Sequence, residues 1–200
     1  MTKDTLKTLG ASNHSEKERS KLDYYGTDPR STKVLLENET FSQNIWEPCA
    51  GHHLMSDVLQ DAGYTVKTTD IADYGFGDEE VNFLKTTEEF DGDIITNPPY
   101  GLSTDFAVKA LEILKPGKKL AMFLRLLFLE GNKRYDKVFK ENPPKTVYVF
   151  SNRQVSDKND DFSHGSAVAY AWFVWEKGFK GDPIIKWVKS KTDNEEEEQE

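Results

Sequence analysis

The sequence has one cysteine, no long apolar run and fewer basic than acidic residues. A single cysteine among 200 residues excludes an internal disulfide framework. No window approaches the roughly 20 consecutive apolar residues that a membrane-spanning helix needs. The polar start, MTKDTLKTLGASNHSEKERS, lacks the apolar core of a signal peptide. We therefore expect a cytoplasmic protein without a membrane partner.

The charge balance limits the class of partner. Lys and Arg number 26 and Asp and Glu 35, which gives a formal net charge of −9 at pH 7. A protein that binds nucleic acid with its whole surface carries the opposite sign. Part of the acidic excess is local, because the chain closes with DNEEEEQE. The rest is only mildly acidic and leaves room for a local basic patch, so composition leaves the partner open.

Composition and patterning indicate one folded domain. Hydrophobic residues make up 36% of the chain and aromatic residues 12%, enough for one buried core. Residues 1–22 are polar and without periodicity, so we expect a disordered or loosely attached segment there. Residues 191–200 form an acidic tail of a kind that is usually disordered. The domain is expected over residues 23–190, with no internal repeat and no linker.

Helix-like and strand-like patterns alternate along this domain. Helices are expected in PRSTKVLLENE, HLMSDVLQDAG, STDFAVKALEILKPG and NKRYDKVFKEN. Asp28 is the expected cap of the first helix, and Ser103 or Thr104 that of the third. Strands are expected in QNIWEPCAG, YTVKTTD, DGDIITN, KKLAMFLRLLFLEG, KTVYVFS, AVAYAWFVWEK and IIKWVKS. This order predicts an α/β fold with a mostly parallel central sheet, an antiparallel edge strand and helices on both faces.

The ends of the first three strands carry the candidate site. Open α/β sheets bind ligands at the carboxyl ends of their strands, near the switch in strand order. Gly51 directly precedes a helix, and Asp70 follows about 20 residues later, where a carboxylate can accept hydrogen bonds from ribose hydroxyls. Each is ordinary alone, but together they indicate a nucleoside-containing cofactor. The turn GHHLMS has one glycine where the dinucleotide fingerprint has three, which favours a cofactor without phosphates, such as S-adenosylmethionine.

The third strand end, TNPPY, has the groups needed to activate a nitrogen whose lone pair is conjugated. The lone pair of a conjugated amine becomes nucleophilic when two acceptors draw its two N–H groups out of the plane. The side-chain carbonyl of Asn97 and the backbone carbonyl of Pro98 can be those acceptors. Pro98 and Pro99 donate no hydrogen bond and have a fixed φ, so the carbonyl orientation is stiff. Tyr100 offers a flat face on which a base can stack.

A second Asn-Pro-Pro, at residues 142–144, serves as an internal control. It precedes a predicted strand instead of following one, and Lys145 stands where the aromatic residue would be. We interpret it as a helix stop and turn. The specific signal is therefore the strand, the tripeptide and the aromatic residue together.

The series EPCAG, TTD and TNPPY resembles the class I S-adenosylmethionine-dependent methyltransferases that methylate planar nitrogens, above all the DNA N6-adenine methyltransferases. Together with DYYGTDP, VYVFSNR and AYAWFVWEKG, it is most similar to the small methyltransferases of phages and prophages, over about residues 23–188. The resemblance implies a Rossmann-like fold, methyl transfer to N6 of adenine in DNA, and the cytoplasm of the host cell if the protein is phage-encoded.

The resemblance also implies the site residues. Catalysis would fall on Asn97, Pro98, Pro99 and Tyr100. Cofactor binding would fall on Tyr25, Thr27, Pro29, Glu47, Cys49, Gly51, Asp70, Ile71, Asn82, Phe83 and Asn97. Two features depart from the family. His53 stands where the turn usually carries a second glycine, and the chain is short for a separate target-recognition domain, so sequence specificity would come from loops, such as 129–145 and 152–166, or from a partner.

Several alternatives stay open beside this hypothesis. Cys49, His52, His53 and the distant His164 suggest zinc, but adjacent histidines before a helix rarely bind one ion and no second cysteine exists, so we expect no metal. Arg153 either contacts a phosphate or is an exposed arginine without such a role. Tyr100 is the other expected substrate-binding residue. The same chemistry suits a glutamine amide in a protein or a base in RNA. A non-catalytic binding protein is a further alternative, and the sequence leaves the oligomeric state unknown.

Overall fold

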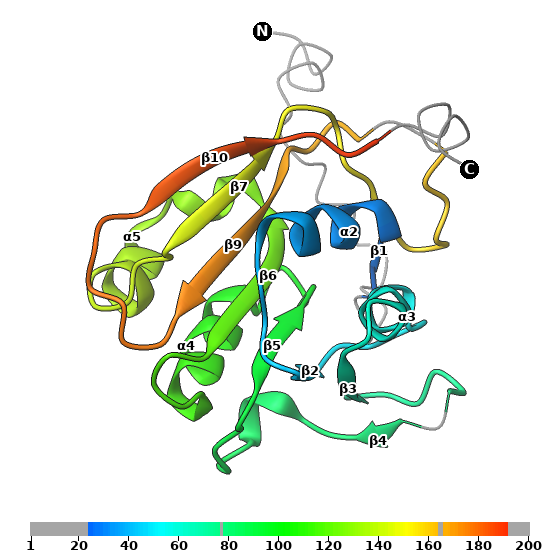
Figure 1. The fold of residues 1–200 in the computed structure, drawn as a ribbon, viewed down its shortest axis with the longest axis horizontal. Coiled ribbons are helices and arrows are strands. Elements are labelled where there is room, and N and C mark those ends of the chain that lie inside the picture. The colour runs from blue at the N-terminus through cyan, green and yellow to red at the C-terminus, as the bar shows by residue number, and fades with distance from the viewer. Residues whose placement is uncertain (1–23, 77, 164–165, 192–200) are drawn as a thin grey trace, which may run out of the picture.

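An eight-stranded sheet forms the centre of the structure, a computed structural model that describes residues 24–76, 78–163 and 166–191 (Figure 1). The expected N-terminal segment 1–22 and nearly all of the expected tail 191–200 lie outside these residues. The strands lie in the order β10 (Ile184–Val188), β7 (Thr146–Phe150), β9 (Tyr170–Glu176), β6 (Lys119–Arg125), β5 (Asp93–Thr96), β2 (Asn44–Glu47), β3 (Thr65–Asp70) and β4 (Glu79–Glu80).

The sheet is parallel except at β9, which runs antiparallel to both of its neighbours, β6 and β7. The mostly parallel sheet is thus as predicted, but the antiparallel strand lies inside the sheet and not at its edge. Its composition explains the difference, because every residue from Tyr170 to Trp175 is buried and both faces are apolar. The edge position belongs to β10, whose Ile184, Ile185 and Trp187 are exposed.

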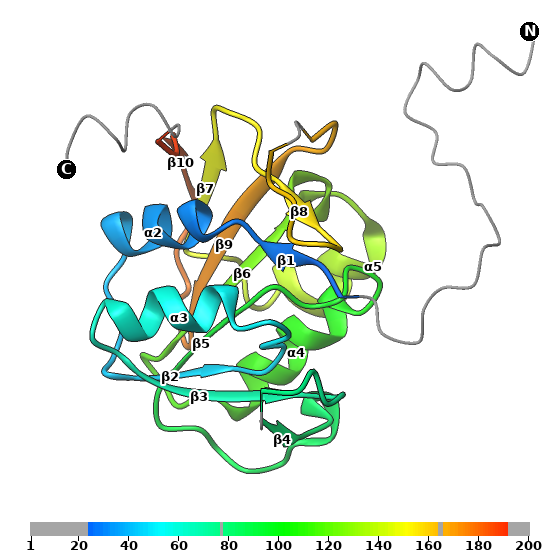
Figure 2. The ribbon, with the colours of Figure 1, turned by 90° about the vertical axis from the view of Figure 1, so that its right-hand side faces the viewer.

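Helices cover both faces of the sheet, as Figure 2 shows. On one face α2 (Pro29–Asn38) and α3 (Leu54–Asp61) pack through Leu35 and Leu59 onto a cluster that includes Trp172. On the other face lie α4 (Ser103–Ile113), the short α5 (Asn132–Arg134) and the π-helical turn η3 (Tyr135–Phe139), which contact the cluster of Phe173 and Trp175. Successive residues of β9 therefore support opposite layers. No helix among the described residues is long and apolar enough to cross a membrane.

The helix starts agree with the sequence in one case and differ in another. Asp28 caps α2 as expected, since its carboxylate accepts the Arg30 backbone N–H at 2.9 Å. The expected cap of α4 is wrong, because Leu102 occupies the cap position. The Ser103 hydroxyl instead donates to the Tyr100 carbonyl at 2.9 Å, so it stabilises the turn between the two prolines and the helix. The helix thus begins three residues after Tyr100, the last residue of the Asn-Pro-Pro-Tyr segment.

Three local features were not expected from the sequence. The segment KKLAMFLRLLFLEG is a strand only as far as Arg125 and then becomes the 3-10 turn η2 (Leu126–Leu129). A separate two-stranded ribbon, made of β1 (Gly26–Thr27) and β8 (Ser156–Asp157), joins the start of the domain to the loop after β7. A second 3-10 turn, η1 (Phe83–Lys85), follows β4. The ribbon and η1 both contribute residues to the site described next.

Candidate active site

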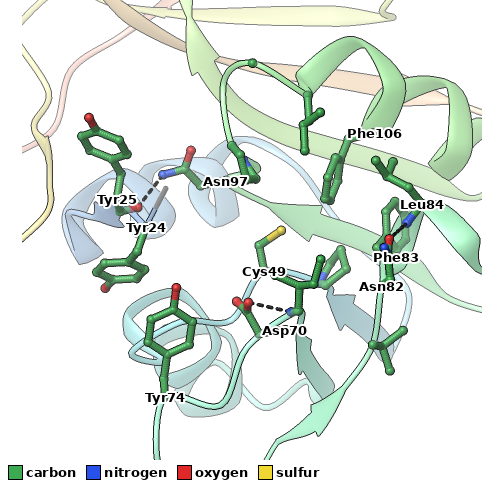
Figure 3. Close-up of a pocket in the computed structure, with 16 residues that line it drawn as sticks. Tyr24, Tyr25, Cys49, Asp70, Tyr74, Asn82, Phe83, Leu84, Asn97 and Phe106 are labelled. Atoms are coloured by element: carbon green, nitrogen blue, oxygen red, sulfur yellow. Dashed lines mark hydrogen bonds between the residues drawn. The ribbon is translucent and has the colours of Figure 1, made fainter. Parts of the chain in front are cut away.

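A cavity of about 460 Å³ lies beyond the carboxyl ends of β2, β3 and β5 (Figure 3). The chain runs from β2 outward to β3 and β4 and then crosses back to β5 on the other side of β2, so this is the switch point of the sheet. Eight residues of the sequence hypothesis line the cavity: Tyr25, Cys49, Asp70, Ile71, Asn82, Phe83, Asn97 and Pro99. The three strand ends therefore do meet at one site.

Asp70, the last residue of β3, is held by backbone donors. Its Oδ1 accepts the N–H groups of Ile71 at 2.7 Å and Ala72 at 3.3 Å, and its Oδ2 accepts that of Gly51 at 3.1 Å. Burial nevertheless raises the pKa of this carboxyl above its usual range, although these donors act against the shift. Each carboxylate oxygen has two lone pairs, so the fixed carboxylate can accept further donors from a ligand in the cavity.

Gly51 adopts a conformation that only glycine adopts readily. Its φ is +50°, and a Cβ at this position would lie 2.2 Å from the Cε2 atom of Tyr24. Tyr24 lines the cavity, and its hydroxyl donates to Asp160 at 2.8 Å. The glycine therefore lets the Tyr24 ring lie against the turn after β2, while its own N–H binds Asp70.

His53, the departure from the family turn, has the backbone conformation of the missing glycine. Its φ is +65°, in the left-handed region, at the start of α3. The side chain compensates, because Nε2 lies 2.6 Å from the Asp78 carboxylate and the ring stacks on Phe76 at 4.8 Å between centroids. The turn thus keeps the geometry that a glycine would give, at the cost of left-handed strain in an L-residue.

This interpretation predicts a difference between two substitutions of His53. His53→Ala removes the Asp78 and Phe76 contacts but keeps the strain, so we expect the free energy of unfolding to fall by about 1 kcal/mol. His53→Gly removes the same contacts and relieves about 1–2 kcal/mol of left-handed strain, so it should be nearly neutral. Urea denaturation of both variants measures the difference. If the glycine variant is less stable than the alanine variant, His53 does not carry left-handed backbone strain.

The far wall of the cavity comes from η1 and α4. The side-chain oxygen of Asn82 accepts the Leu84 N–H at 3.2 Å, which leaves its amide N–H groups for the cavity. Phe83 is 2% exposed and stacks on Phe106 at 5.0 Å, so it is mainly a core residue that closes the base of the cavity. Ile71 is 60% exposed and presents an apolar surface at the rim. These groups suit a flat, apolar ligand with one ring acceptor.

Asn97 lies where β5 ends, and its amide orientation is set by three acceptors. Its Nδ2 donates to the Tyr25 carbonyl at 3.0 Å, to Thr27 Oγ1 at 2.9 Å and to Ser156 Oγ at 3.3 Å. The Tyr25 carbonyl can only accept, so the nitrogen must face it. The opposite atom, Oδ1, is buried and has no hydrogen-bond partner among the described residues. A buried acceptor without a donor is costly, which is typical of a functional position.

The β1–β8 ribbon supplies these acceptors and lies over the site. Thr27 is opposite Ser156 in the ribbon, so both hydroxyls reach the same Asn97 amide. Asp160 secures the ribbon, since it accepts the Tyr24 hydroxyl and its Oδ2 lies 2.6 Å from His52 Nδ1. Sequence reasoning missed Ser156 and Asp160, which lie in a polar loop with no periodic signal. The Asn-Pro-Pro-Tyr motif gives no indication of what holds its amide.

Tyr100 lies beside the cavity, enclosed by other side chains. Its hydroxyl donates to Ser156 at 2.9 Å, and the Arg125 guanidinium lies 4.5 Å from its ring centroid. The rings of Tyr25 and Tyr170 are tilted against it at 5.7 and 6.0 Å. Burial raises the pKa of the phenol well above its usual range, so Tyr100 stays protonated near neutral pH. The hydroxyl belongs to the network around Asn97.

The remaining predicted residues lie at the margin of the site or outside it. Thr27 and Glu47 line a smaller cavity of about 10 Å³ next to Asn97, and burial raises the pKa of Glu47 well above its usual range. Pro98 is buried next to Asn97. Pro29 begins α2 and lines neither cavity, and Arg153 is exposed on the loop after β7.

The zinc alternative and the internal control can also be compared with the structure. His52 and His53 turn to two different carboxylates, those of Asp160 and Asp78, and His164 lies outside the described residues. Burial raises the pKa of the Cys49 thiol, which lines the cavity as a neutral group. Asn142 lies at a helix end before β7, where its carbonyl accepts the indole N–H of Trp175 at 3.1 Å. Asn142 is therefore a turn residue, as predicted for the second Asn-Pro-Pro.

Solved structures share this fold at low sequence identity. A protein from Listeria monocytogenes assigned to the class I S-adenosylmethionine-dependent methyltransferases has a TM-score of 0.60 at 12% identity, covering 94% of this chain and 70% of that chain. A predicted O-methyltransferase from Agrobacterium tumefaciens has a TM-score of 0.55 at 12% identity, with 82% and 86% covered. A protein from Lactococcus lactis assigned as a hemolysin has a TM-score of 0.58 at 14% identity, with 83% and 95% covered.

These similarities establish the fold alone. No protein-family model matches the sequence, and no curated protein matches it significantly. The mixed sheet, the switch point at β2 and the shared architecture confirm the predicted fold class, that of the Rossmann-like class I methyltransferases. The activity has to be argued from the side chains at the site.

Proposed function

We propose that this protein is an S-adenosylmethionine-dependent methyltransferase that methylates the exocyclic N6 of adenine in DNA. The observation that carries the proposal is the orientation of Asn97. Three acceptors hold its Nδ2, and this arrangement leaves Oδ1 as a fixed, buried acceptor that no described residue donates to. Such an atom suits a ligand with an N–H to donate, and the amine of adenine is one.

The cavity fits the proposed cofactor in shape and in chemistry. Asp70 offers carboxylate oxygens to two ribose hydroxyls, and Ile71 offers an apolar surface to the adenine ring. Asn82 can donate its amide N–H to a ring nitrogen, since its oxygen is already bound to Leu84. The volume of about 460 Å³ is within the range of small-molecule sites. When bound, S-adenosylmethionine supplies an electrophilic methyl group.

The residues of the chain would activate the nitrogen without a general base. Asn97 Oδ1 and the Pro98 carbonyl accept the two N–H groups of the amine, so the nitrogen becomes pyramidal and its lone pair leaves conjugation. The lone pair would then point at the methyl group that a bound S-adenosylmethionine would supply. The extra proton goes to water, because a neutral amide oxygen is a poor base. Burial of Asn97 Oδ1 strengthens the hydrogen bond that it accepts.

Incubation of the purified protein with labelled S-adenosylmethionine tests the proposal. DNA, RNA and protein are supplied as separate substrates, and the labelled product is digested and identified. We expect N6-methyladenine in DNA. Methylated RNA or a methylated glutamine amide would agree with the mechanism but contradict DNA as the substrate. Absence of transfer to all three would contradict the proposal that the protein is a methyltransferase.

The role of Tyr100 gives a further prediction. If its ring stacks on an extruded adenine, Tyr100→Ala should lower kcat/KM for DNA about tenfold, since base stacking contributes ~1–3 kcal/mol. Tyr100→Phe keeps the ring beside Arg125 and loses the hydrogen bond to Ser156, so most of the activity should remain. Steady-state kinetics compare the two. Equal damage in both variants would assign the role to the hydroxyl and not to stacking.

A further inference from the structure

Arg125 lies at the mouth of the site but belongs to neither the motif nor the cavity. It is the last residue of β6, three positions beyond Met122, which is opposite Thr96 of β5. The side chain is exposed, and its guanidinium lies 4.5 Å from the centre of the Tyr100 ring. The structure thus places an arginine next to the segment that would hold the reacting nitrogen.

Arg125 differs from Arg30 and Arg134 in its surroundings. Arg30 is paired with the Asp28 carboxylate at 2.7 Å, and Arg134 binds backbone carbonyls of η2 and lies over Phe128. Within the described ranges, Arg125 has no carboxylate in ion-pair distance, and its guanidinium lies over the Tyr100 ring. Its charge is therefore positioned but not neutralised by an anionic side chain of those ranges.

The contact with the Tyr100 ring uses none of the hydrogen-bond donors of Arg125. A guanidinium that lies on a ring uses its face, whereas its five N–H groups point outward in the plane. The Tyr100 ring is itself anchored, since its hydroxyl donates to Ser156 at 2.9 Å. An anchored ring holds the planar fork in one orientation, and such a fork matches an oxyanion in a bidentate manner.

We propose that Arg125 binds a backbone phosphate of the nucleic-acid strand, next to the nucleotide whose base enters the site. The inference rests on the proposed function, because it takes Tyr100 and Asn97 as the place of the target base. It answers the question left by a net charge of −9, since a polyanion can approach an acidic protein where a local cation faces it. Lys158 lies 4.8 Å from the centre of the Tyr25 ring, which adjoins Tyr100, so a second cation lies at the same mouth.

The proposal also separates the substrate classes. A glutamine side chain in a protein carries no phosphate beside the reacting nitrogen, so a phosphate site at this position favours a nucleic acid. DNA and RNA share the phosphodiester, and Arg125 alone does not distinguish them. Binding of both is therefore measured in the test.

Binding of fluorescent oligonucleotides of random sequence, followed by anisotropy over a range of salt concentrations, tests the site. Arg125→Gln should weaken DNA binding about tenfold and reduce the slope of log K against log salt by about 0.9, the value for one phosphate contact. Arg125→Lys keeps the charge but loses the planar fork, so it should restore the slope and only part of the affinity. Lys180→Gln removes one charge at an exposed position between β9 and β10, at the end of the sheet opposite the site, and should leave the affinity and the slope unchanged.

Each outcome bears on a separate part of the argument. An Arg125→Gln variant with the affinity and slope of the wild type would overturn the phosphate site, whether or not DNA is methylated. The same loss in Lys180→Gln would also overturn it, because the effect would then be one of overall charge. Wild-type binding that depends on Arg125 without any methyl transfer to DNA would keep the phosphate site and overturn the proposed reaction. Tight, Arg125-dependent binding of RNA alone would assign the phosphodiester to RNA.

Discussion

Replacement of Asn97 by alanine should lower turnover by about a hundredfold or more. The substitution removes one of the two acceptors that would hold the amine in the transition state, and loss of a comparable transition-state hydrogen bond in other enzymes costs about that much. The measurement is methyl incorporation into adenine-containing DNA at saturating cofactor. Calorimetric titration with S-adenosylmethionine accompanies it, and cofactor affinity should change little, because Oδ1 would bind the substrate nitrogen.

Asn97→Ala also removes the amide nitrogen that binds the β1–β8 ribbon, so a second variant separates position from chemistry. Thr27→Val keeps Oδ1 and removes one of the three acceptors of Nδ2. We expect an intermediate loss of turnover, since the Tyr25 carbonyl and Ser156 still hold the amide. A Thr27→Val variant as inactive as Asn97→Ala, with weak cofactor binding in both, would point to collapse of the ribbon and not to a lost acceptor.

Asn142→Ala is the matched control within the same chain. It changes the same residue type in the same tripeptide, but Asn142 contacts Val138 and Trp175 through its backbone alone, and those bonds survive the substitution. Turnover should therefore stay essentially intact. If Asn142→Ala loses activity and Asn97→Ala keeps it, the active site has been assigned to the wrong Asn-Pro-Pro motif. If both variants stay active, any methylation observed does not use this mechanism.

The sequence predicts much of the site because strand ends are local features. Asp70 and Asn97 each follow a short buried strand, and parallel strands bring their carboxyl ends to one edge of the sheet. No contact between distant segments has to be known for that inference. The cap of α2 was predicted for the same reason, since Asp28 and Pro29 act on the first turn of their own helix.

What the sequence could not show depends on pairing between distant segments. Ser156 reaches Asn97 only because β8 pairs with β1, and Asp160 reaches Tyr24 from 136 residues away. Two-residue strands have no periodicity from which to predict them. The position of β9 inside the sheet also depends on pairing, because its apolar composition determines neither its neighbours nor its direction. His53 shows the same limit for the backbone, since the contact that compensates its left-handed conformation is with Asp78, 25 residues further on.

Asp70→Ala should cost the largest loss of cofactor affinity. We expect wild-type protein to bind S-adenosylmethionine or its demethylated product in the micromolar range, about −8 kcal/mol. The substitution removes the acceptor of two ribose hydroxyls, so affinity should fall by about 1–3 kcal/mol, as for other hydrogen bonds to charged groups. Asp61→Ala, at the exposed end of α3, is the matched control and should bind as the wild type does. Calorimetry that shows no wild-type binding, or equal binding by Asp70→Ala, would remove the cofactor assignment.

The pH dependence of binding gives the same prediction a second readout. The ribose hydroxyls donate best to an ionised Asp70, so the cofactor binds the deprotonated form and affinity must fall as the pH drops through the pKa of the free protein. Burial raises the pKa of Asp70 above its usual range, so this decline should begin at a higher pH than for an exposed aspartate. Asp70→Asn cannot titrate, and its weaker binding should be nearly independent of pH over the same interval. If the wild-type affinity is as independent of pH as that of Asp70→Asn, Asp70 does not hold the ribose.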